Sequence, residues 1–427
     1  MPGDDQAGLG REFGWLWSGQ TVSQLGSMVT TVALPLVVVL RLHGSTFEVG
    51  LVEALQWLPT AVISLPVGAW ADRRHKRPLL IAANLGQAAA VGSIPAAAAL
   101  GRLTLAQVLA AALVIGLFEL VFQVSYGNYL RSLVPDRALL RLANTRSQAA
   151  DSATRVGGPG LAGVLVSAFG APFALVADAA SFVLSTAALL VIRAAEPRES
   201  RSARTVPYLA AIREGLAFTF RDPLLRNLTV SASLANMCLT ALGAIEIPYL
   251  ARDLGAPAAA IGVVIAAGSV GGLVGAAAAG RLSRVLGDGR LSRLALAGTA
   301  PFGLLLPAAG RGAGLALFVV GLAFLEAGIV ISAIVVNTFR QSYCPHDMLG
   351  RVSASMQTLQ LGLVPVGALA GGALAAAAGN RAALWILCVA NLTPAAWRLL
   401  SPGLRQRDLP AGPSLRPGAP GARQPAR

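Results

Sequence analysis

Long apolar stretches alternate with short polar segments along the whole chain of 427 residues. A membrane-spanning helix needs about 20 consecutive, mostly apolar residues, and twelve stretches are long enough for one. They cover residues 13–40, 47–71, 78–100, 104–129, 145–168, 171–193, 224–250, 258–282, 291–309, 313–337, 352–378 and 382–400. The pattern predicts an all-α membrane protein with twelve transmembrane helices.

The second half of the chain repeats the first at a shift of about 210 residues. Residues 131–174 match residues 341–384 without gaps, and the matched pairs include Pro135 with Pro345. Many transporters are built from two duplicated six-helix units. We therefore expect two pseudo-symmetric six-helix bundles.

The longest polar stretch lies between the sixth and seventh apolar segments and divides the chain into four predicted regions. These are an N-terminal bundle at 1–193, a cytoplasmic linker at 194–223, a C-terminal bundle at 224–400 and a disordered tail at 401–427, rich in Pro and Arg. Four apolar residues of the linker recur at helical spacing: Leu209, Ile212, Leu216 and Phe220. This spacing predicts a short amphipathic helix on the inner membrane surface; a plain solvated linker is the alternative.

Most basic residues fall between the apolar segments on one side of the predicted membrane. With both termini in the cytoplasm, the outer loops hold five of the 34 basic residues, namely Arg41, Arg102, Arg252, Arg311 and Arg381. Basic loops stay on the cytoplasmic side, so this partition supports an even number of helices. The formal charge of +14 is explained by this topology and not by nucleic-acid binding, because the basic residues form no single stripe.

The rest of the composition argues against an ordinary soluble protein and against a metal site. Charged residues make up only 13% of the chain and hydrophobic residues 55%. Three cysteines and three histidines lie scattered without metal-ligand spacing, so we expect no metal and no cofactor. The amino terminus has no basic region before its first apolar stretch, which favours a retained first helix over a signal peptide.

Two predicted helices carry matching polar stripes. Gln20, Gln24, Ser27 and Thr31 share one face of the first helix, and Thr229, Ser233, Asn236 and Thr240 repeat the same spacing in the seventh. Either helix packing or a water-filled cavity can satisfy such a stripe, and the glutamines favour a cavity. We expect these eight residues and Gln123 to line the substrate cavity.

Two acidic residues within predicted spans are the preferred proton carriers. Glu119 and Glu326 lie in the fourth and tenth helices at nearly equivalent positions of the repeat. An ionisable group within a membrane helix is costly and is a functional candidate by default. A carboxyl group in an apolar cavity can gain or lose a proton near neutral pH.

The other ionisable residues within the spans have simpler interpretations. Asp151 and Arg155 are four residues apart in the fifth helix, a spacing that predicts an ion pair. Glu53, Asp178 and Glu246 lie nearer the predicted outer ends of their helices. There they can reach the membrane interface or close an outer gate.

A loop motif gives the chain a family resemblance. The sequence from Gly68 through Asp72 and Arg73 to Lys76 and Arg77 resembles the signature loop of the major facilitator superfamily, and the resemblance extends to about residue 400. Within the family the chain is similar to bacterial exporters of the enterobactin exporter and macrolide efflux type. The resemblance implies a cavity lined by helices 1, 4, 7 and 10. It also implies that Asp72 stabilises the outward-facing state by pairing with nearby basic residues and the start of helix 11.

A second motif lies in the fifth helix. Gly157, Gly158, Pro159 and Gly163 resemble the Gly-Pro antiporter motif of drug-proton exchangers. A proline frees a backbone carbonyl and glycines permit close helix approach, so the segment should be bendable or tightly packed. The motif favours export over uptake.

Together these features predict a monomeric exporter of the bacterial cytoplasmic membrane, and not an enzyme. Its partners would be lipid, protons and a small, moderately hydrophobic organic compound such as a drug, antibiotic or siderophore. The alternatives are a solute uptake symporter or a lipid flippase of the same fold and, more remotely, a membrane enzyme or a receptor.

Overall fold

The computed structural model describes residues 6–134, 136–193, 208–401, 404 and 406–409. The first half contains α1 (Gln6–Leu36), η1 (Val37–Arg41), α2 (Thr46–Asp72), α3 (Lys76–Ala99), α4 (Leu105–Leu133), α5 (Arg137–Phe169) and α6 (Ala171–Val191). The connection contains α7 (Tyr208–Arg221). The second half contains α8 (Pro223–Pro248), η2 (Tyr249–Asp253), α9 (Ala258–Leu286), α10 (Asp288–Thr299), η3 (Ala300–Leu304), α11 (Leu305–Ala308), η4 (Gly312–Gly314), α12 (Leu315–Tyr343), α13 (His346–Gly362), α14 (Val364–Ala378), α15 (Asn380–Ala390) and α16 (Leu392–Leu400).

These elements form the twelve predicted membrane spans. Among the described residues, 11 spans are long and apolar enough to cross a membrane by length and composition alone. The twelfth is α5, whose 33 residues include several charged side chains in its first half. It begins at Arg137 and not at residue 145 as predicted, because the side chain of Asp136 caps it by accepting hydrogen bonds from the backbone N–H groups of Ala138 and Leu139.

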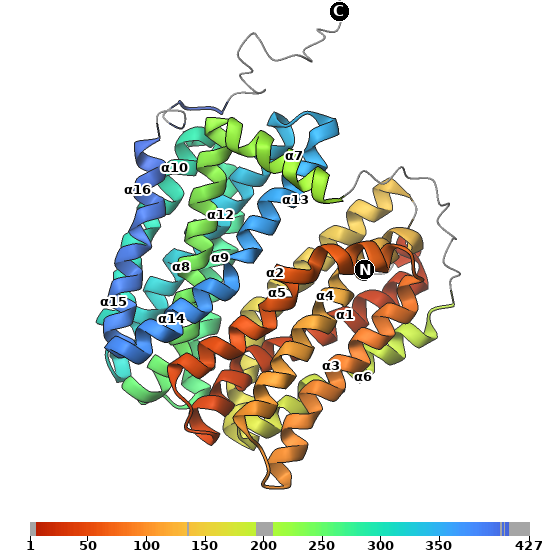
Figure 1. The fold of residues 1–427 in the computed structure, drawn as a ribbon, viewed down its shortest axis with the longest axis vertical. Helices are drawn as coiled ribbons and strands as arrows, with labels where there is room; N and C mark the ends of the chain where they lie inside the picture. Colours follow the sequence, from red (N-terminus) through yellow and green to blue (C-terminus); the bar gives the residue numbers. More distant parts are fainter. Residues whose placement is uncertain (1–5, 135, 194–207, 402–403, 405, 410–427) are drawn as a thin grey trace, which may run out of the picture.

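The spans pack as two bundles related by the sequence repeat (Figure 1). Helices α1 to α6 pack mainly on one another, and α8 to α16 do the same. Corresponding joints have matching backbones: Gly170 between α5 and α6 has φ 82° and ψ 156°, and Gly379 between α14 and α15 has φ 84° and ψ 154°. Positive φ favours glycine at both joints, so the repeat extends to the turns.

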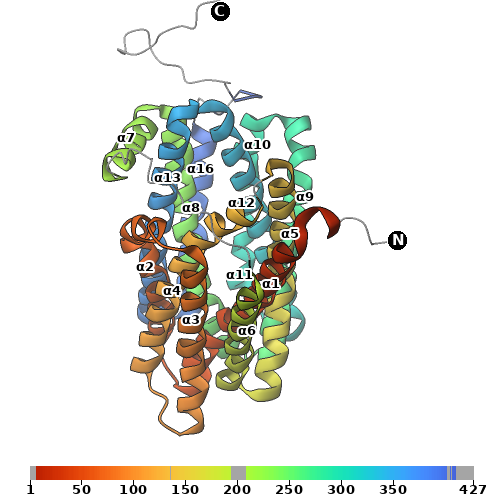
Figure 2. The same ribbon diagram turned by 90° about the vertical axis from the view of Figure 1, so that its right-hand side faces the viewer.

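The predicted linker helix is α7, which packs beside α13 at one end of the molecule (Figure 2). Glu214 on α7 accepts a hydrogen bond from Arg351 Nη1 on α13 at 2.6 Å. A Cβ atom on Gly215 would lie 2.4 Å from the carbonyl oxygen of Arg351, so only glycine permits this approach. The linker helix is therefore attached to the second half. The start of the predicted linker, at 194–207, lies outside the described residues.

The predicted disordered tail is wrong for its first residues. Leu404 is fully buried, and the backbone N–H of Gly289 in α10 donates to the carbonyl oxygen of Arg407 at 3.0 Å. Burial of a leucine and a backbone hydrogen bond offset the entropy of ordering this segment. Residues 410–427 of the predicted tail lie outside the described residues.

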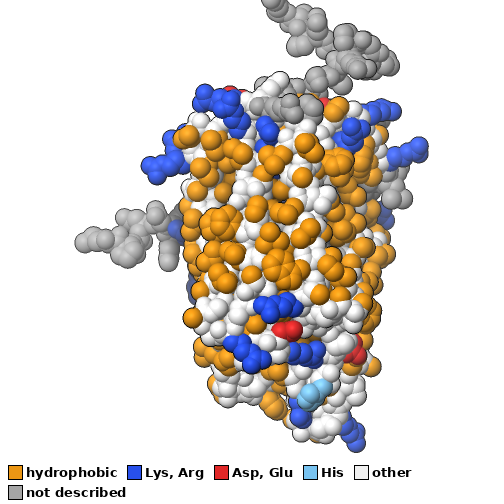
Figure 3. Space-filling model, turned by 90° about the vertical axis from the view of Figure 1, so that its left-hand side faces the viewer, with side chains coloured by type: hydrophobic (Ala, Val, Ile, Leu, Met, Phe, Trp, Pro, Cys, Tyr) orange, Lys and Arg blue, Asp and Glu red, His pale blue; other side chains and the backbone are white. Residues whose placement is uncertain are grey.

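Apolar side chains cover much of the surface between the two ends of the molecule. Figure 3 shows hydrophobic side chains over the middle of one face, with Lys and Arg side chains gathered at the top and in a group toward the lower end. Large apolar side chains on this surface are exposed, among them Val164, Leu184 and Val274 at 59% each. Such a surface is stable only against lipid. The protein is therefore a multi-pass membrane protein.

An arginine that the sequence analysis did not single out joins four helices of the second half. Arg398 on α16 is fully buried. Its Nε donates to Ser231 Oγ on α8 at 2.8 Å, and its Nη1 donates to Ser332 Oγ on α12 at 2.6 Å and to the carbonyl oxygen of Ser292 on α10 at 3.2 Å. The feature of the sequence that could have pointed to Arg398 is its position inside the last predicted span. Hydrogen bonds to a charged group stabilise more than those between neutral groups.

Replacing this arginine should destabilise the second half. We expect Arg398→Ala to lower the free energy of unfolding by about 2 to 4 kcal/mol, because it removes buried hydrogen bonds and leaves a cavity. Thermal unfolding of the purified protein in detergent measures the effect. Arg281→Ala, at an exposed position on α9, is the matched control. Equal melting temperatures for the two variants would refute this role.

Candidate functional site

Four helices meet at the centre of the molecule. Helix α1 of the first half contacts α8 of the second half, α4 contacts α1, and α12 contacts α8. These are the first, fourth, seventh and tenth spans, which the family resemblance assigned to the cavity.

The polar stripe of α1 is accessible. Gln20, Gln24 and Ser27 are half-buried, and Thr31 is exposed with its hydroxyl donating to the carbonyl oxygen of Ser27 at 3.0 Å. The side-chain oxygen of Gln20 is buried and has no hydrogen-bond partner among the described residues. The partly exposed side chains of Gln24, Ser27 and Thr31 can offer neutral hydrogen-bonding groups to a ligand.

The stripe of α8 differs from the prediction. Asn236 and Thr240 are half-buried, and Asn236 Nδ2 donates to the carbonyl oxygen of Gln360 at 3.2 Å. Thr229 and Ser233 are only 0% and 2% exposed, so they do not line an accessible cavity as predicted. They lie in the part of α8 that neighbouring helices of the second half cover, where small polar residues serve packing.

Glu119 lies in a polar group within the first half. Its Oε1 accepts a hydrogen bond from Gln123 Nε2 at 2.7 Å, and Gln87 of α3 is a nearby amide. The exposed apolar residues of α4 include Leu113 and Leu117. At 3.6 residues per turn, Glu119 lies on the opposite side of the helix from that face. Glu119 is half-buried, whereas Gln123 is exposed.

Asp178 does not reach the membrane interface. It is 1% exposed on α6 and accepts hydrogen bonds from the hydroxyl groups of Thr30 on α1 and Ser181 on its own helix. Gly26 of α1 allows this contact, since a Cβ atom there would lie 2.7 Å from Asp178 Oδ1. The carboxyl group thus joins α1 to α6, and Glu119 is its acidic neighbour.

A second acidic group includes residues from both halves. Glu246 on α8 has two charged neighbours, Glu326 on α12 and Glu53 on α2. Arg155 on α5 is the basic neighbour of Glu326 and forms the predicted ion pair with Asp151 at 3.0 Å. Glu53, Glu246 and Glu326 thus form one acidic group. Glu119 and Glu326, predicted as an equivalent pair, belong to two different groups.

The motif of α5 forms a tight contact with α9 across the two halves. A Cβ atom on Gly262 of α9 would lie 2.4 Å from the carbonyl oxygen of Pro159 and 2.8 Å from Gly163 Cα. Gly158 packs on α1, where its Cβ would meet Met28 at 2.3 Å, whereas Gly157 has nothing within 4 Å. Helix α5 continues through Pro159. The motif is therefore a packing surface in this conformation.

Helices α2 and α14 form the equivalent contact on the other side of the molecule. A Cβ atom on Gly50 would lie 2.5 Å from the carbonyl oxygen of Ala368, and one on Gly372 would lie 3.1 Å from that of Thr46. We call the end of the molecule where these two contacts join the halves the closed end, and the end that carries α7 the open end. Backbone-to-backbone approach at the closed end depends on glycine in both helix pairs.

Polar bonds between the halves reinforce the closed end. The guanidinium group of Arg252 in η2 donates to the carbonyl oxygens of Val39 and Gly44 in the first half. Asn380 bridges the halves: its Oδ1 accepts from Thr46 Oγ1 at 2.7 Å, and its Nδ2 donates to Asp253 Oδ2 at 2.6 Å. Sequence reasoning missed these residues because the partners lie more than 120 positions apart.

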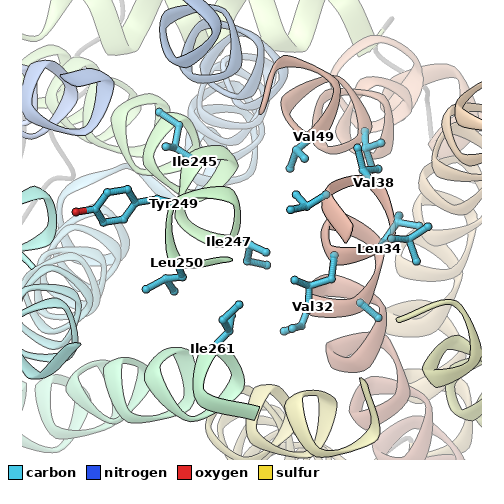
Figure 4. Close-up of a cluster of buried hydrophobic side chains, with 14 of the residues drawn as sticks. Val32, Leu34, Val38, Val49, Ile245, Ile247, Tyr249, Leu250 and Ile261 are labelled. Atoms are coloured by element: carbon cyan, nitrogen blue, oxygen red, sulfur yellow. The ribbon is translucent and has the colours of Figure 1, made fainter. Parts of the chain in front are cut away.

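Apolar side chains fill the space between the halves near this end (Figure 4). Val32, Val38 and Val49 come from the first half, and Ile247 and Ile261 from the second, all buried. Buried apolar side chains without a polar group exclude water. The closed end is therefore sealed.

The signature loop lies at the open end, where Asp72 and Arg77 contact other residues of the first half. Asp72 is exposed, 3.9 Å from Lys76 Nζ and 3.3 Å from Asn128 Nδ2. Arg77 donates to the carbonyl oxygens of Leu189 and Leu190 at the end of α6. Gly68 has nothing within 4 Å, and Arg73 is exposed. Among the described residues, no hydrogen bond joins Asp72 to the start of α13, which begins the eleventh span.

The described residues offer no metal site, since no three His, Cys, Asp or Glu side chains are grouped to hold an ion. The three cysteines are free and buried.

A methyl group on Gly262 should open the closed end. We expect Gly262→Ala to force α5 and α9 apart, because overpacking against backbone atoms costs about 1 to 3 kcal/mol. Labelling of a Val38→Cys variant with a membrane-impermeant maleimide reports the change, since position 38 is fully buried in the closed structure. Gly280→Ala, with nothing within 4 Å, is the control on the same helix. Equal labelling of both alanine variants would contradict the assignment.

Comparison with known proteins agrees with this architecture. The chain is 28% identical over 405 residues to the multidrug efflux pump Tap of Mycolicibacterium fortuitum, covering 91% of this chain and 95% of the pump. A structure of the nucleoside transporter NupG superposes with a TM-score of 0.76 at 10% identity, over 91% of this chain and 98% of that one.

A bacterial homologue of the iron transporter ferroportin has been solved in two states. The inward-facing structure matches with a TM-score of 0.71 at 18% identity, and the outward-facing structure with 0.56 at 20%. Each match covers 91% of this chain and 98% of the other. These similarities are at the level of the fold.

The family model of the Major Facilitator Superfamily matches residues 16–363 and 247–425. Two bundles of membrane helices, a polar centre and the family match agree: the chain is a transporter, not an enzyme, and belongs to the Major Facilitator Superfamily.

Proposed function

We propose that the protein exports a small, moderately hydrophobic organic compound across the bacterial cytoplasmic membrane in exchange for protons. Residues 1–193 and 224–400 would rock as two rigid units, as a monomer, and expose the centre to each side in turn. The observation that carries the proposal is the combination of one sealed end with a centre that holds neutral polar groups and carboxyl groups.

The orientation follows from the basic residues. Loops rich in arginine favour the cytoplasmic side, so both termini and the open end would lie in the cytoplasm and the closed end outside. The structure would then be inward-facing. The better match to the inward-facing ferroportin homologue supports this assignment.

Two observations support export. Similarity to a multidrug efflux pump covers nearly the whole chain, and the glycine-proline segment of α5 resembles an antiporter motif. The ligand would be a drug, antibiotic or siderophore, because the accessible stripe of α1 offers amide and hydroxyl groups and no fixed charge.

Proton exchange is assigned to Glu119 and Glu326. Both lie on central helices, and both are half-buried. A carboxyl group that is partly withdrawn from water can alternate between its charged and neutral forms as its surroundings change.

Drug resistance tests the proposed activity in cells. We expect expression in a bacterial host lacking its own pumps to raise resistance to some compounds in a panel of antibiotics and siderophores. Glu119→Gln and Glu326→Gln should return resistance to the level of empty plasmid, because an amide cannot carry a proton. Glu12→Gln, at the open end of α1, should keep full resistance. Unchanged resistance in both central variants would remove the coupling assignment.

Reconstitution in vesicles tests the direction and the coupling ion. With a compound from the resistance panel inside and an acidic medium outside, we expect efflux that stops when an ionophore collapses the pH gradient. Fluorescence or radiolabel measures the compound that remains. Accumulation of the compound along with protons would instead identify a symporter, and movement of labelled lipid between leaflets would identify a flippase.

A further inference from the structure

Two acidic side chains from opposite halves lie next to each other near the closed end. Glu53 is on α2 and Glu246 is on α8, and these helices contact each other. A Cβ atom on Gly243, one turn before Glu246, would lie 3.9 Å from Glu53 Oε1. Their charges are close enough to act on each other. The pair thus crosses the boundary between the two halves.

Among the described residues, no basic side chain is found in an ion pair with Glu53 or Glu246. The ion pairs of the described residues instead join Lys76 to Asp72, Arg155 to Asp151 and Arg351 to Glu214. Oε1 of Glu246 is buried and has no hydrogen-bond partner in the described part of the chain.

Among the described residues, the charged group that acts on Glu246 besides Glu53 is also acidic. Glu326 of α12 acts on Glu246, whereas Arg155 of α5 acts on Glu326 and pairs with Asp151. Helix α14, which packs along α8, has no charged residue. Arg252 and Asp253 of η2 bond to Val39, Gly44 and Asn380 at the closed end. Arg351 and Arg398 bond near the open end.

The pair lies immediately inside the seal. Gly50, which touches Ala368, is one turn from Glu53, and the neighbouring Val52 and Ile245 are 1% and 0% exposed. Glu53 and Glu246 themselves are half-buried. Closing the halves therefore brings the two carboxyl groups together, and separating the halves parts them.

We propose that Glu53 and Glu246 form a proton-controlled latch, which lets the closed end shut only when the pair holds at least one proton. Two neighbouring ionised carboxyl groups repel each other, and a proton shared between them removes the repulsion and adds a hydrogen bond. The latch gives proton binding a direct mechanical consequence. It requires no contact between the proton and the transported compound.

In the orientation proposed above, the latch links each closure to one proton. With the halves apart at the outer side, a carboxylate of the pair takes a proton from outside, and the closed end can shut. In the inward-facing state the half-buried pair releases that proton toward the cytoplasm. The two charges then repel, which favours reopening outside. This inference rests on the proton exchange of the proposed function and not on the direction in which the compound moves.

The distance between the halves at the closed end tests the latch without any transported compound. Spin labels can be attached to Arg102→Cys and Ala313→Cys, two exposed positions at that end of the first and second halves. Double electron–electron resonance then measures the distance between the labels. The native cysteines are buried. In lipid nanodiscs we expect the short distance to dominate at acidic pH and a longer distance to appear as the pH rises.

Matched variants make the test decisive. Glu53→Gln, Glu246→Gln and the double variant should show the short distance at every pH, because no charged pair can form. Glu12→Gln, which removes a carboxyl group at the open end, should respond as the unaltered protein does, and so should Glu53→Asp, which keeps the titrating group. Thermal unfolding checks that each variant is folded.

Two results would overturn the latch. One is a folded double glutamine variant that opens with rising pH as the unaltered protein does. The other is an unaltered protein whose distance does not change with pH. Neither result decides the proposed function, because the roles of Glu119 and Glu326 are tested by drug resistance in cells, and transport driven by a pH gradient is tested in vesicles.

Discussion

Backbone-to-backbone contact between the two halves is the constraint on which this conformation depends. Gly262 against Pro159 and Gly163, and Gly50 against Ala368, bring helices so close that no side chain fits between them. In lipid, where apolar surfaces gain nothing by leaving water, such close packing is a main source of helix association. The same contacts seal one end and leave the other end free. Small residues at four positions thus determine which side of the molecule is shut.

The seal determines the surroundings of the acidic residues next to it. Carboxyl groups within a membrane protein are costly unless they are neutral, paired or hydrated. Asp178 is hydrogen-bonded by hydroxyl groups and Asp151 is paired with Arg155, so these two are satisfied within the first half. Glu53 and Glu246 meet across the halves without a basic partner of their own. Their energy therefore depends on how the halves are arranged, whereas the energy of the satisfied residues does not.

The halves also differ in how they are stiffened. In the second half, Arg398 joins α8, α10, α12 and α16, and the segment that follows α16 packs back onto α10. In the first half, Arg77 fastens the start of α3 to the end of α6. Each half is cross-linked internally by polar bonds, while the bonds between halves gather at one end. This distribution allows the halves to move as units about the closed end.

The sequence by itself determined the membrane class, the twelve spans, the duplication and the ion pair of Asp151 with Arg155. Each of these depends on neighbours along the chain: run length, spacing of four residues, or a repeat of about 210. Tertiary structure alone decided which polar residues are accessible, because burial depends on what the other helices cover. Thr229 and Ser233 share the spacing of Gln20 and Gln24 yet are buried. The meeting of Glu53 with Glu246, and of Asn380 with Thr46, likewise depends on how two bundles are placed against each other, and one sequence carries no local signal for that.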